Sequence, residues 1–397
     1  MKLNTIKKVI SKGYCLGCGL CHVVDQNCSI LEKNGNLISS YNKKGKGHIV
    51  VCPAAGYDIV NLGKSIHSAK KYNYELGWFN KLILVQSVDK SILRKASSGG
   101  AMTTIALYML EKGYADGVIC TKYSYTNPNS PRPITFIART KEELLQAQGS
   151  KYCPTSPLSI LGRLNKDEKY VLIGTPCQIA GWQSYKKEFA PSVNIVLTIA
   201  NFCGGYRDYR ELDYFVHKIA GYNSVRYFQH RGDGVPGYMK IIDENDNEWK
   251  YPYPEYAHFS PIEKNKRCVY CVDATGELAD ISCGDAWIDR IKKTGESWST
   301  LILRNAKAEK LLKEIVENNS FRTGDISEEE VIQSQKLNIT SKKYRQVKRI
   351  RLRTLLLGYV PNWNNSIKDF GGSYFNECKI LLSKFIRNKV LRQFHKL

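Results

Sequence analysis

The sequence predicts a mixed α/β protein, with a small N-terminal module before a larger α/β core and a basic helical tail. The core is predicted by an apolar strand (82–87), a glycine loop, an apolar helix (101–112) and a strand (117–120), an order typical of α/β layering. Two further apolar runs, 170–173 and 195–200, each end in a loop that contains glycine and cysteine. Open α/β sheets place ligands at such strand ends.

The N-terminal module spans residues 1–65 and contains the run Cys15-Leu16-Gly17-Cys18-Gly19-Leu20-Cys21, with Cys52-Pro53 further on. Cys-x-x-Cys-x-x-Cys with a later Cys-Pro is the ligand pattern of a ferredoxin-type 4Fe–4S cluster. The glycines let the backbone wrap around the cluster and direct N–H groups at its sulfurs. We therefore predict a ferredoxin-like module in which the cluster ligands are Cys15, Cys18, Cys21 and Cys52.

The spacing indicates one cluster in this module. Asp25 stands where the triad's own fourth cysteine would fall, and no second triad precedes Cys52. Cys28 is a spare thiol that could replace Cys52 as a ligand. A structural zinc site is the alternative, but zinc knuckles usually pair two Cys-x-x-Cys units, which favours the iron–sulfur cube.

Length and composition describe an ordinary globular chain. It has 397 residues, 43% hydrophobic and 24% charged, with room for two or three domains. We expect a cytoplasmic protein, because the sequence has no apolar run of transmembrane length and no signal peptide. Thirteen cysteines in such a protein indicate metal or redox chemistry and not disulfides.

The net charge of +22 is uneven, because residues 338–397 carry 14 Lys and Arg against 2 Asp and Glu. A basic tail could contact an anionic membrane surface, an acidic electron donor or nucleic acid, or could be a solvated helix. The tail lacks regularly spaced stacking aromatics, so we expect no specific nucleic-acid binding.

The remaining elements follow in chain order. Residues 66–80 form a predicted linker with aromatic anchors. The core then divides into two parts, 80–170 and 171–335, before the helical tail 336–397. Helices are predicted over 141–148 and 306–318, and the Gly-, Pro- and Tyr-rich stretch 221–260 predicts hairpins and loops.

Six ordered segments resemble the beta subunits of the coenzyme F-420 (deazaflavin) hydrogenase/dehydrogenase family. They are Ser98-Gly99-Gly100, Gly149-Ser150-Lys151-Tyr152, Gly174-Thr175-Pro176-Cys177-Gln178, Phe202-Cys203, Cys268-x-x-Cys271 and Ala279-Asp280-Ile281-Ser282-x-Gly284-Asp285-Ala286. The resemblance covers residues 15 to about 290. It implies an FAD-binding core that carries its own 4Fe–4S cluster beside the ferredoxin-like module, and a link to surface-polysaccharide loci. The resemblance does not extend to coenzyme F-420 itself, because nothing in the sequence shows a deazaflavin site.

Four core cysteines support a second cluster independently of the resemblance. Cys177, Cys203, Cys268 and Cys271 come from three separated loops, and converging loops are what a cluster needs. Cys283 competes for one ligand position. The alternative is that Cys177 and Cys203 are ordinary buried thiols. We interpret Cys120, Cys153 and Cys378 as structural.

The glycine loops suit a flavin. A Ser-Ser-Gly-Gly loop at a helix N-terminus offers N–H groups to a pyrophosphate, although it is also a common plain N-cap. Lys151 could lie near the flavin ring or be a solvated loop lysine. The predicted cofactor-binding residues are Ser98, Gly99, Gly100, Ser150, Lys151, Tyr152 and Thr175.

Two functions remain open from the sequence. In the preferred one, electrons pass from a ferredoxin-like donor through the clusters to FAD and on to an unknown small organic substrate. In the alternative, the chain is a non-catalytic electron-transfer subunit of a larger oxidoreductase. His230, in a loop with Arg231 and Asp233, is a candidate proton donor. Asp280, Asp285 and Trp287 form a candidate acid–base group, although turn aspartates are commonly structural.

Overall fold

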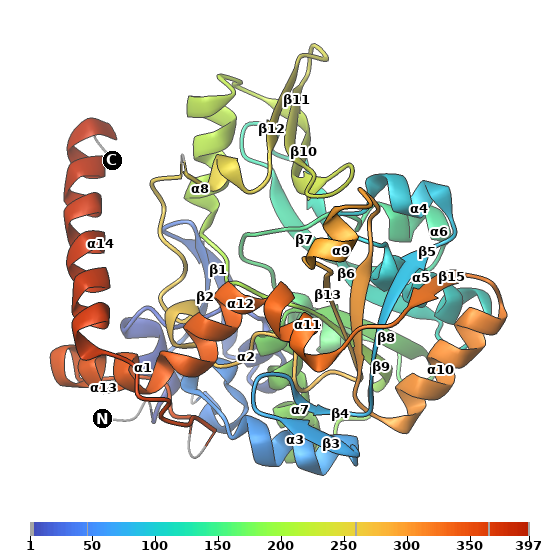
Figure 1. Cartoon of the computed structure of the whole chain (residues 1–397). Helices are drawn as coiled ribbons and strands as arrows, with labels where there is room; N and C mark the ends of the chain where they lie inside the picture. The colour runs from blue at the N-terminus through green and yellow to red at the C-terminus, as the bar shows by residue number, and fades with distance from the viewer. Residues whose placement is uncertain (1–3, 46, 259, 364–365, 396–397) are drawn as a thin grey trace.

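An eight-stranded mixed sheet forms the centre of the molecule (Figure 1). The computed structural model describes residues 4–45, 47–258, 260–363 and 366–395. The predicted module, core and tail each include a few residues outside these ranges, namely 1–3, 46, 259, 364–365 and 396–397. The strand order is β15-β5-β14-β13-β9-β8-β6-β7. In chain order the strands are β5 (Lys81–Ser87), β6 (Gly117–Ser124), β7 (Arg132–Ala138), β8 (Lys169–Gly174), β9 (Asn194–Asn201), β13 (Ile281–Asp285), β14 (Ser299–Leu303) and β15 (Phe321–Gly324).

The four central strands β13, β9, β8 and β6 are parallel, and the flanking pairs are antiparallel. The carboxyl ends of these parallel strands therefore meet at one edge of the sheet, which is where open α/β sheets bind ligands. The mixed α/β class predicted from the sequence is confirmed.

Helices cover both faces because side chains alternate along each strand. Val171 and Ile199 face a core shared with α5 (Ala101–Glu111) and α10 (Ala306–Glu317). Leu172 and Ala200 face the opposite core, which contains α7 (Pro176–Phe189) and η3 (Pro157–Arg163). The shorter helices around the sheet are α4 (Lys90–Lys95), α6 (Lys141–Leu145) and α9 (Asp289–Lys292).

The N-terminal segment packs on the α7 side of the sheet, where Leu20, Val51 and Ile59 join the core of that face. Its elements are α1 (Ile6–Ser11), α2 (Leu20–Val24), the hairpin β1 (Cys28–Lys33) and β2 (Asn36–Tyr41), η1 (Ile49–Val51), η2 (Pro53–Ala55) and α3 (Ile59–His67). The predicted linker contains a short hairpin, β3 (Lys71–Asn73) and β4 (Gly77–Phe79), and it is not a solvated spacer because Leu76 and Phe79 are buried.

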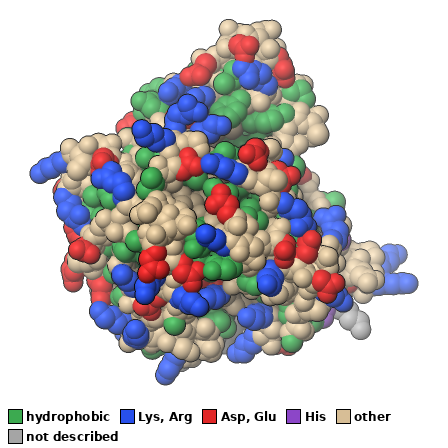
Figure 2. Space-filling model, turned by 90° about the vertical axis from the view of Figure 1, so that its right-hand side faces the viewer, with side chains coloured by type: hydrophobic (Ala, Val, Ile, Leu, Met, Phe, Trp, Pro, Cys, Tyr) green, Lys and Arg blue, Asp and Glu red, His purple; other side chains and the backbone are tan. Residues whose placement is uncertain are grey.

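Within the predicted stretch 221–260, residues 225–252 form hairpins, as a separate three-stranded antiparallel sheet at the top of Figure 1. Its strands are β10 (Val225–Gly232), β11 (Tyr238–Asp243) and β12 (Glu248–Pro252), accompanied by α8 (Tyr209–Tyr214), η4 (Phe215–Ile219) and η5 (Glu255–His258). Figure 2 shows this subdomain above a face on which basic and acidic side chains are interspersed.

The tail is helical, as predicted. It contains α12 (Lys336–Ile339), η7 (Thr340–Tyr344), α13 (Gln346–Leu357) and α14 (Tyr374–His395), and it follows α11 (Glu328–Ser334). In Figure 1, α14 stands at the left edge of the molecule, and α13 lies at the lower left, beside α1. Within the described part of the chain, no helix is both long enough and apolar enough to span a membrane.

Candidate functional site

The structure brings the four predicted N-terminal ligands together. Burial raises the pKa of the Cys15 and Cys18 thiols, and the neighbouring thiols of the set raise them further. The backbone N–H of Ser39 lies 3.4 Å from the Cys15 sulfur, and the N–H groups of Ala54 and Ala55 point at the Cys52 sulfur. Buried sulfurs surrounded by N–H donors are a suitable environment for an iron–sulfur cluster.

Gly17 and Gly19 are required by this loop. Their φ angles are +61° and +95°, in the region that favours glycine. A Cβ on Gly17 would lie 2.3 Å from the Cβ of Leu37, and one on Gly19 would lie 2.4 Å from the Ser159 nitrogen. The loop can therefore pack against β2 and η3 only without side chains at these two positions.

Cys28 lies beside Cys21 and hydrogen-bonds to its sulfur. This bond is the largest cause that lowers the pKa of Cys21, to about 6. The structure thus places Cys52 with the triad and Cys28 as a neighbour of one member, while the identity of the fourth ligand stays a prediction.

The core cysteines also converge, at the carboxyl edge of the parallel strands. Cys177 lies in the first turn of α7 after β8, Cys203 follows β9, and Cys268 and Cys271 bracket η6 (Cys268–Tyr270). Burial, with the thiols of the other three, raises the pKa of Cys177 to about 12. The Thr175 hydroxyl lies 3.2 Å from the Cys177 sulfur, and the Gly205 N–H donates to the Cys203 sulfur at 3.4 Å. These sulfurs and their donors fit a second cluster.

The other thiols lie outside both sets. Cys283 is in the middle of β13, inside the apolar core, and burial alone raises its pKa. Cys120 lies within β6 in the same core. No group of three His, Cys, Asp or Glu side chains in the described residues is close enough to hold a single metal ion. In a cube each thiolate binds a different iron, so its ligands need not converge on one point.

Two residues that the sequence did not single out lie between the cysteine sets. Burial raises the pKa of Tyr206 well above its usual value, and the thiols that raise it further belong to both sets, namely Cys268, Cys177, Cys15 and Cys18. Arg267 is 1% exposed and donates to the carbonyl oxygens of Pro53 (2.7 Å) and Ala54 (2.9 Å). The two cysteine sets are therefore neighbours joined by direct contacts.

The predicted flavin loop lies at the same sheet edge. Gly100 has φ +76° and precedes α5, whose N-terminus has no side-chain cap. The Ser98 hydroxyl is 2.8 Å from that of Ser299, and the Ser97 hydroxyl is 3.2 Å from that of Ser150. These residues leave backbone N–H groups free for a phosphate, but their hydroxyls already have partners.

Two hollows flank this loop. The first is a small cavity of about 20 Å³ beside Ser98, Asp285 and Trp287. The second is an open groove of about 390 Å³, lined by Lys90, Leu93, Arg94, Asp233, Gly234 and Ser297. Binding sites for drug-sized ligands measure roughly 300–1,000 Å³. Only the groove lies in this range, and the first hollow is too small for a whole FAD.

Lys151 is not a solvated loop lysine. Its ammonium donates to three backbone carbonyls, those of Ala147, Gln148 and Gly149, at 2.7–3.1 Å. Burial lowers the pKa of this lysine to about 8. The carbonyls that follow α6 occupy all three N–H donors of this ammonium. A direct hydrogen bond to a flavin would therefore require one of these bonds to break.

Arg231 organises the wall opposite the glycine loop. Its guanidinium donates to Asp285 (2.7 Å), to the Ser97 carbonyl (2.6 Å) and to the Tyr152 hydroxyl. Asp285 also accepts from the Trp287 indole at 2.9 Å. Asp285 and Trp287 therefore lie at the crevice, whereas Asp280 binds Thr198 and Asn305 in a structural role.

His230 is buried beside Tyr152, with their ring centroids 5.7 Å apart. Its Nδ1 lies 2.5 Å from the Tyr123 hydroxyl, and its Nε2 has no hydrogen-bond partner in the described structure. Burial lowers the pKa of His230 to about 3. Asp233 instead forms an ion pair with Lys240.

The interpretation of the tail as a solvated basic helix is wrong for its first part. Lys342, Lys343, Gln346 and Arg349 are all buried. Lys342, Gln346 and Arg349 pack against the loop that carries Cys268 and Cys271, so a segment distant in sequence covers one side of the core cysteine set. Lys343 instead pairs with Glu277.

The mixed α/β core carries one cysteine set at the carboxyl edge of its parallel strands, and comparison with known proteins gives the family. Residues 82–161 match the N-terminal model, and residues 167–329 the C-terminal model, of the coenzyme F420 hydrogenase/dehydrogenase beta subunit. The chain belongs to this family.

Named relatives agree with this assignment. The chain is 25% identical over 268 residues to the coenzyme F420 hydrogenase subunit beta of Methanosarcina barkeri, covering 64% of this chain and 84% of that protein. It is 23% identical over 302 residues to the F420-dependent formate dehydrogenase subunit beta of Methanocaldococcus jannaschii, covering 73% and 75%. A chain of the F420-reducing NiFe hydrogenase complex from Methanosarcina barkeri has the same fold, with a TM-score of 0.58 and 23% identity over 74% of this chain and 98% of that one.

Proposed function

We propose that this protein is an iron–sulfur electron-transfer subunit that works with a partner oxidoreductase subunit or a ferredoxin-like donor. The observation that carries the proposal is the closeness of two four-cysteine sets, because Arg267, next to Cys268, donates to the carbonyl oxygens of Pro53 and Ala54, which follow Cys52. Two sets so close together suit electron transfer along a chain of cofactors. The relatives support the partner, since their names describe subunits of hydrogenases and formate dehydrogenases.

In this proposal Cys15, Cys18, Cys21 and Cys52 hold one 4Fe–4S cluster, and Cys177, Cys203, Cys268 and Cys271 hold a second. Clusters at these sites would supply one-electron transfer. The chain itself buries the sulfurs and directs N–H and hydroxyl donors at them, including Gly205 and Thr175. Arg267 fixes the two cysteine loops relative to one another.

We further propose that FAD binds at the crevice beside Ser98, Gly99 and Gly100, with Ser150, Tyr152 and Thr175 nearby. A bound flavin would supply exchange between one-electron and two-electron chemistry. The free N–H groups at the start of α5 support a phosphate there. A cytoplasmic location and contact of the tail with a membrane surface remain predictions, and no observation bears on a link to polysaccharides.

A second candidate is a self-sufficient flavoprotein oxidoreductase that acts on a small organic substrate. It is favoured by His230, whose buried Nε2 is free beside Tyr152 and could hold or pass a proton. The two candidates differ in one result, because only the self-sufficient enzyme would oxidise or reduce a small substrate without a partner protein.

The test is an anaerobic absorbance spectrum of the purified chain with iron, sulfide and flavin assays on the same sample. The proposal predicts about eight iron and eight sulfide per chain and one FAD. About four iron without flavin would leave only the N-terminal set as a cluster site. A colourless protein that holds zinc would contradict the proposal entirely.

A further inference from the structure

The tail segment that follows the family-matched region reaches the core cysteine set. Gln346, the first residue of α13, donates its side-chain N–H to the carbonyl oxygens of Cys271 (2.7 Å) and Val269 (3.1 Å). Arg349 donates to the Val269 carbonyl at 3.0 Å. The backbone between Cys268 and Cys271 is therefore held from the side by residues beyond 329, where the family match ends.

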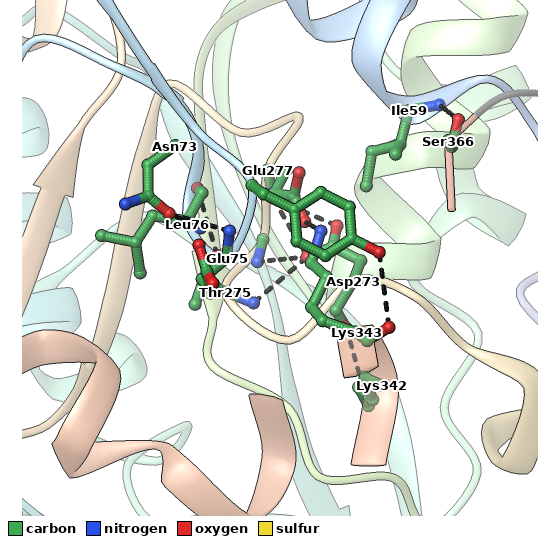
Figure 3. Close-up of polar contacts among 12 residues, drawn as sticks. Ile59, Asn73, Glu75, Leu76, Asp273, Thr275, Glu277, Lys342, Lys343 and Ser366 are labelled. Carbon is green, nitrogen blue, oxygen red and sulfur yellow. Dashed lines mark hydrogen bonds and ion pairs between the residues drawn. The ribbon is translucent and has the colours of Figure 1, made fainter. Parts of the chain in front are cut away.

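Lys342 is the cation of this segment that lies against a sulfur. Its Nζ is 3.6 Å from the Cys271 sulfur and 2.7 Å from the Asp273 carbonyl oxygen, and the residue is 4% exposed. Figure 3 shows Lys342 directed toward the Asp273 turn. The Asp273 carboxylate cannot serve Lys342 exclusively, because it accepts the N–H groups of Thr275, Gly276 and Glu277.

The adjacent lysine shows the contrast. Lys343 is also buried, and its Nζ pairs with the Glu277 carboxylate at 2.5 Å (Figure 3). Among the described residues, no Asp or Glu forms an ion pair of this kind with Lys342. A buried charge is costly unless an opposite charge lies near it, and here the Cys271 sulfur, 3.6 Å from Nζ, is an acidic group in direct contact with Lys342.

We infer that Lys342 is a positioning residue that raises the reduction potential of the core cluster. The inference rests on the proposed function, because it requires a cluster at Cys177, Cys203, Cys268 and Cys271. Adding an electron makes a thiolate-ligated cluster more negative, and a fixed cation near a ligand sulfur stabilises that reduced form. Lys264, which binds the Gly204 carbonyl at 2.9 Å, is a second cation near the set but is more exposed.

The test is an anaerobic redox titration of the full reconstituted chain, followed by absorbance and electron paramagnetic resonance. Lys342→Met removes the charge, and Lys342→Arg keeps it. The double variant Lys343→Met/Glu277→Gln is the matched control, because it removes the neighbouring buried lysine together with its counter-charge. Cys271→Ser identifies which of the two reduction steps belongs to the core cluster.

In Lys342→Met we expect the core cluster's ratio of reduced to oxidised form to fall at least tenfold at a fixed potential, which equals a shift of about 59 mV for one electron. In Lys342→Arg and in the control, we expect the reduction potential of the core cluster to keep its wild-type value. The reduction potential of the N-terminal cluster should stay unchanged in every variant. If Lys342→Met fails to retain iron, Lys342→Gln, which is neutral but keeps N–H donors, replaces it.

An unchanged potential in a neutral variant with full iron content overturns the inference. So does loss of four iron atoms in both neutral variants, since the lysine would then retain the cluster instead of setting its potential. A wild-type chain that binds no core iron is a different result, because it removes the proposed function and the inference with it.

Discussion

The guanidinium of Arg267 donates to the carbonyl oxygen of Pro53 at 2.7 Å, and this bond ties the residue before Cys268 to the residue after Cys52. The same side chain stacks on the Trp363 ring, 4.4 Å from its centroid. One buried arginine thus contacts both cysteine loops and the tail.

Replacement of Arg267 by Met should destabilise the protein by about 3 kcal/mol, because two buried carbonyl oxygens lose their donor. Anaerobic urea unfolding measures this loss. Arg163→Met, at an exposed position, is the control and should change the stability by about 0.5 kcal/mol or less. Equal stabilities of the two variants would show that Arg267 does not fix the loops.

Serine substitutions should distinguish the cysteines that bind a cluster from those that do not. Cys271→Ser is expected to remove about four of eight iron atoms, because its sulfur belongs to the core set. Cys283→Ser should keep all the iron, since Cys283 lies inside the apolar core of the sheet. Iron and sulfide assays check both, and loss of iron in Cys283→Ser would make Cys283 the ligand.

Gly17→Ala should abolish the N-terminal cluster selectively. The new Cβ would lie 2.3 Å from that of Leu37, so the loop that carries Cys15 and Cys18 would have to move. Gly113→Ala is the matched control, because Gly113 also has a positive φ, +65°, but has open space around it. The control should cost only about 1 kcal/mol of backbone strain and retain all iron. Full iron content in Gly17→Ala would contradict the proposed loop geometry.

His67 should make stability depend on pH. Burial lowers its pKa from 6.5 to about 4, so the folded protein binds fewer protons than the unfolded one between these values. The contribution of neutral His67 is therefore complete above pH 6.5 and is lost as the pH falls. Relative to a His67→Gln variant, the wild type should lose about 2 kcal/mol between pH 6.5 and pH 5, since each pKa unit corresponds to about 1.36 kcal/mol.

Anaerobic unfolding of both proteins at several pH values measures this difference. His22→Gln is the control, because His22 lies near the surface of the N-terminal module and makes one hydrogen bond to the Cys28 carbonyl. If the difference in unfolding free energy between the wild type and His67→Gln does not change with pH, His67 is not buried as a neutral group.

Much of the fold could be predicted because its signals are local. The apolar runs at 170–173 and 195–200 became β8 and β9, and the helix predicted over 101–112 became α5. The motif spacing named the cysteines that the structure then brought together. Lys151 was not predictable in the same way, since its contacts with three carbonyls depend on how the end of α6 turns.

The α/β class, the helical tail and the cysteine motifs could be predicted from the sequence, because side-chain periodicity and ligand spacing act over a few residues. The positions of Tyr206 and Arg267 between the two cysteine sets, and of Lys342 against Cys271, became visible only in the folded chain. These contacts join segments separated by 71 to 214 residues. They are set by packing of whole elements against the sheet, and no local pattern encodes them.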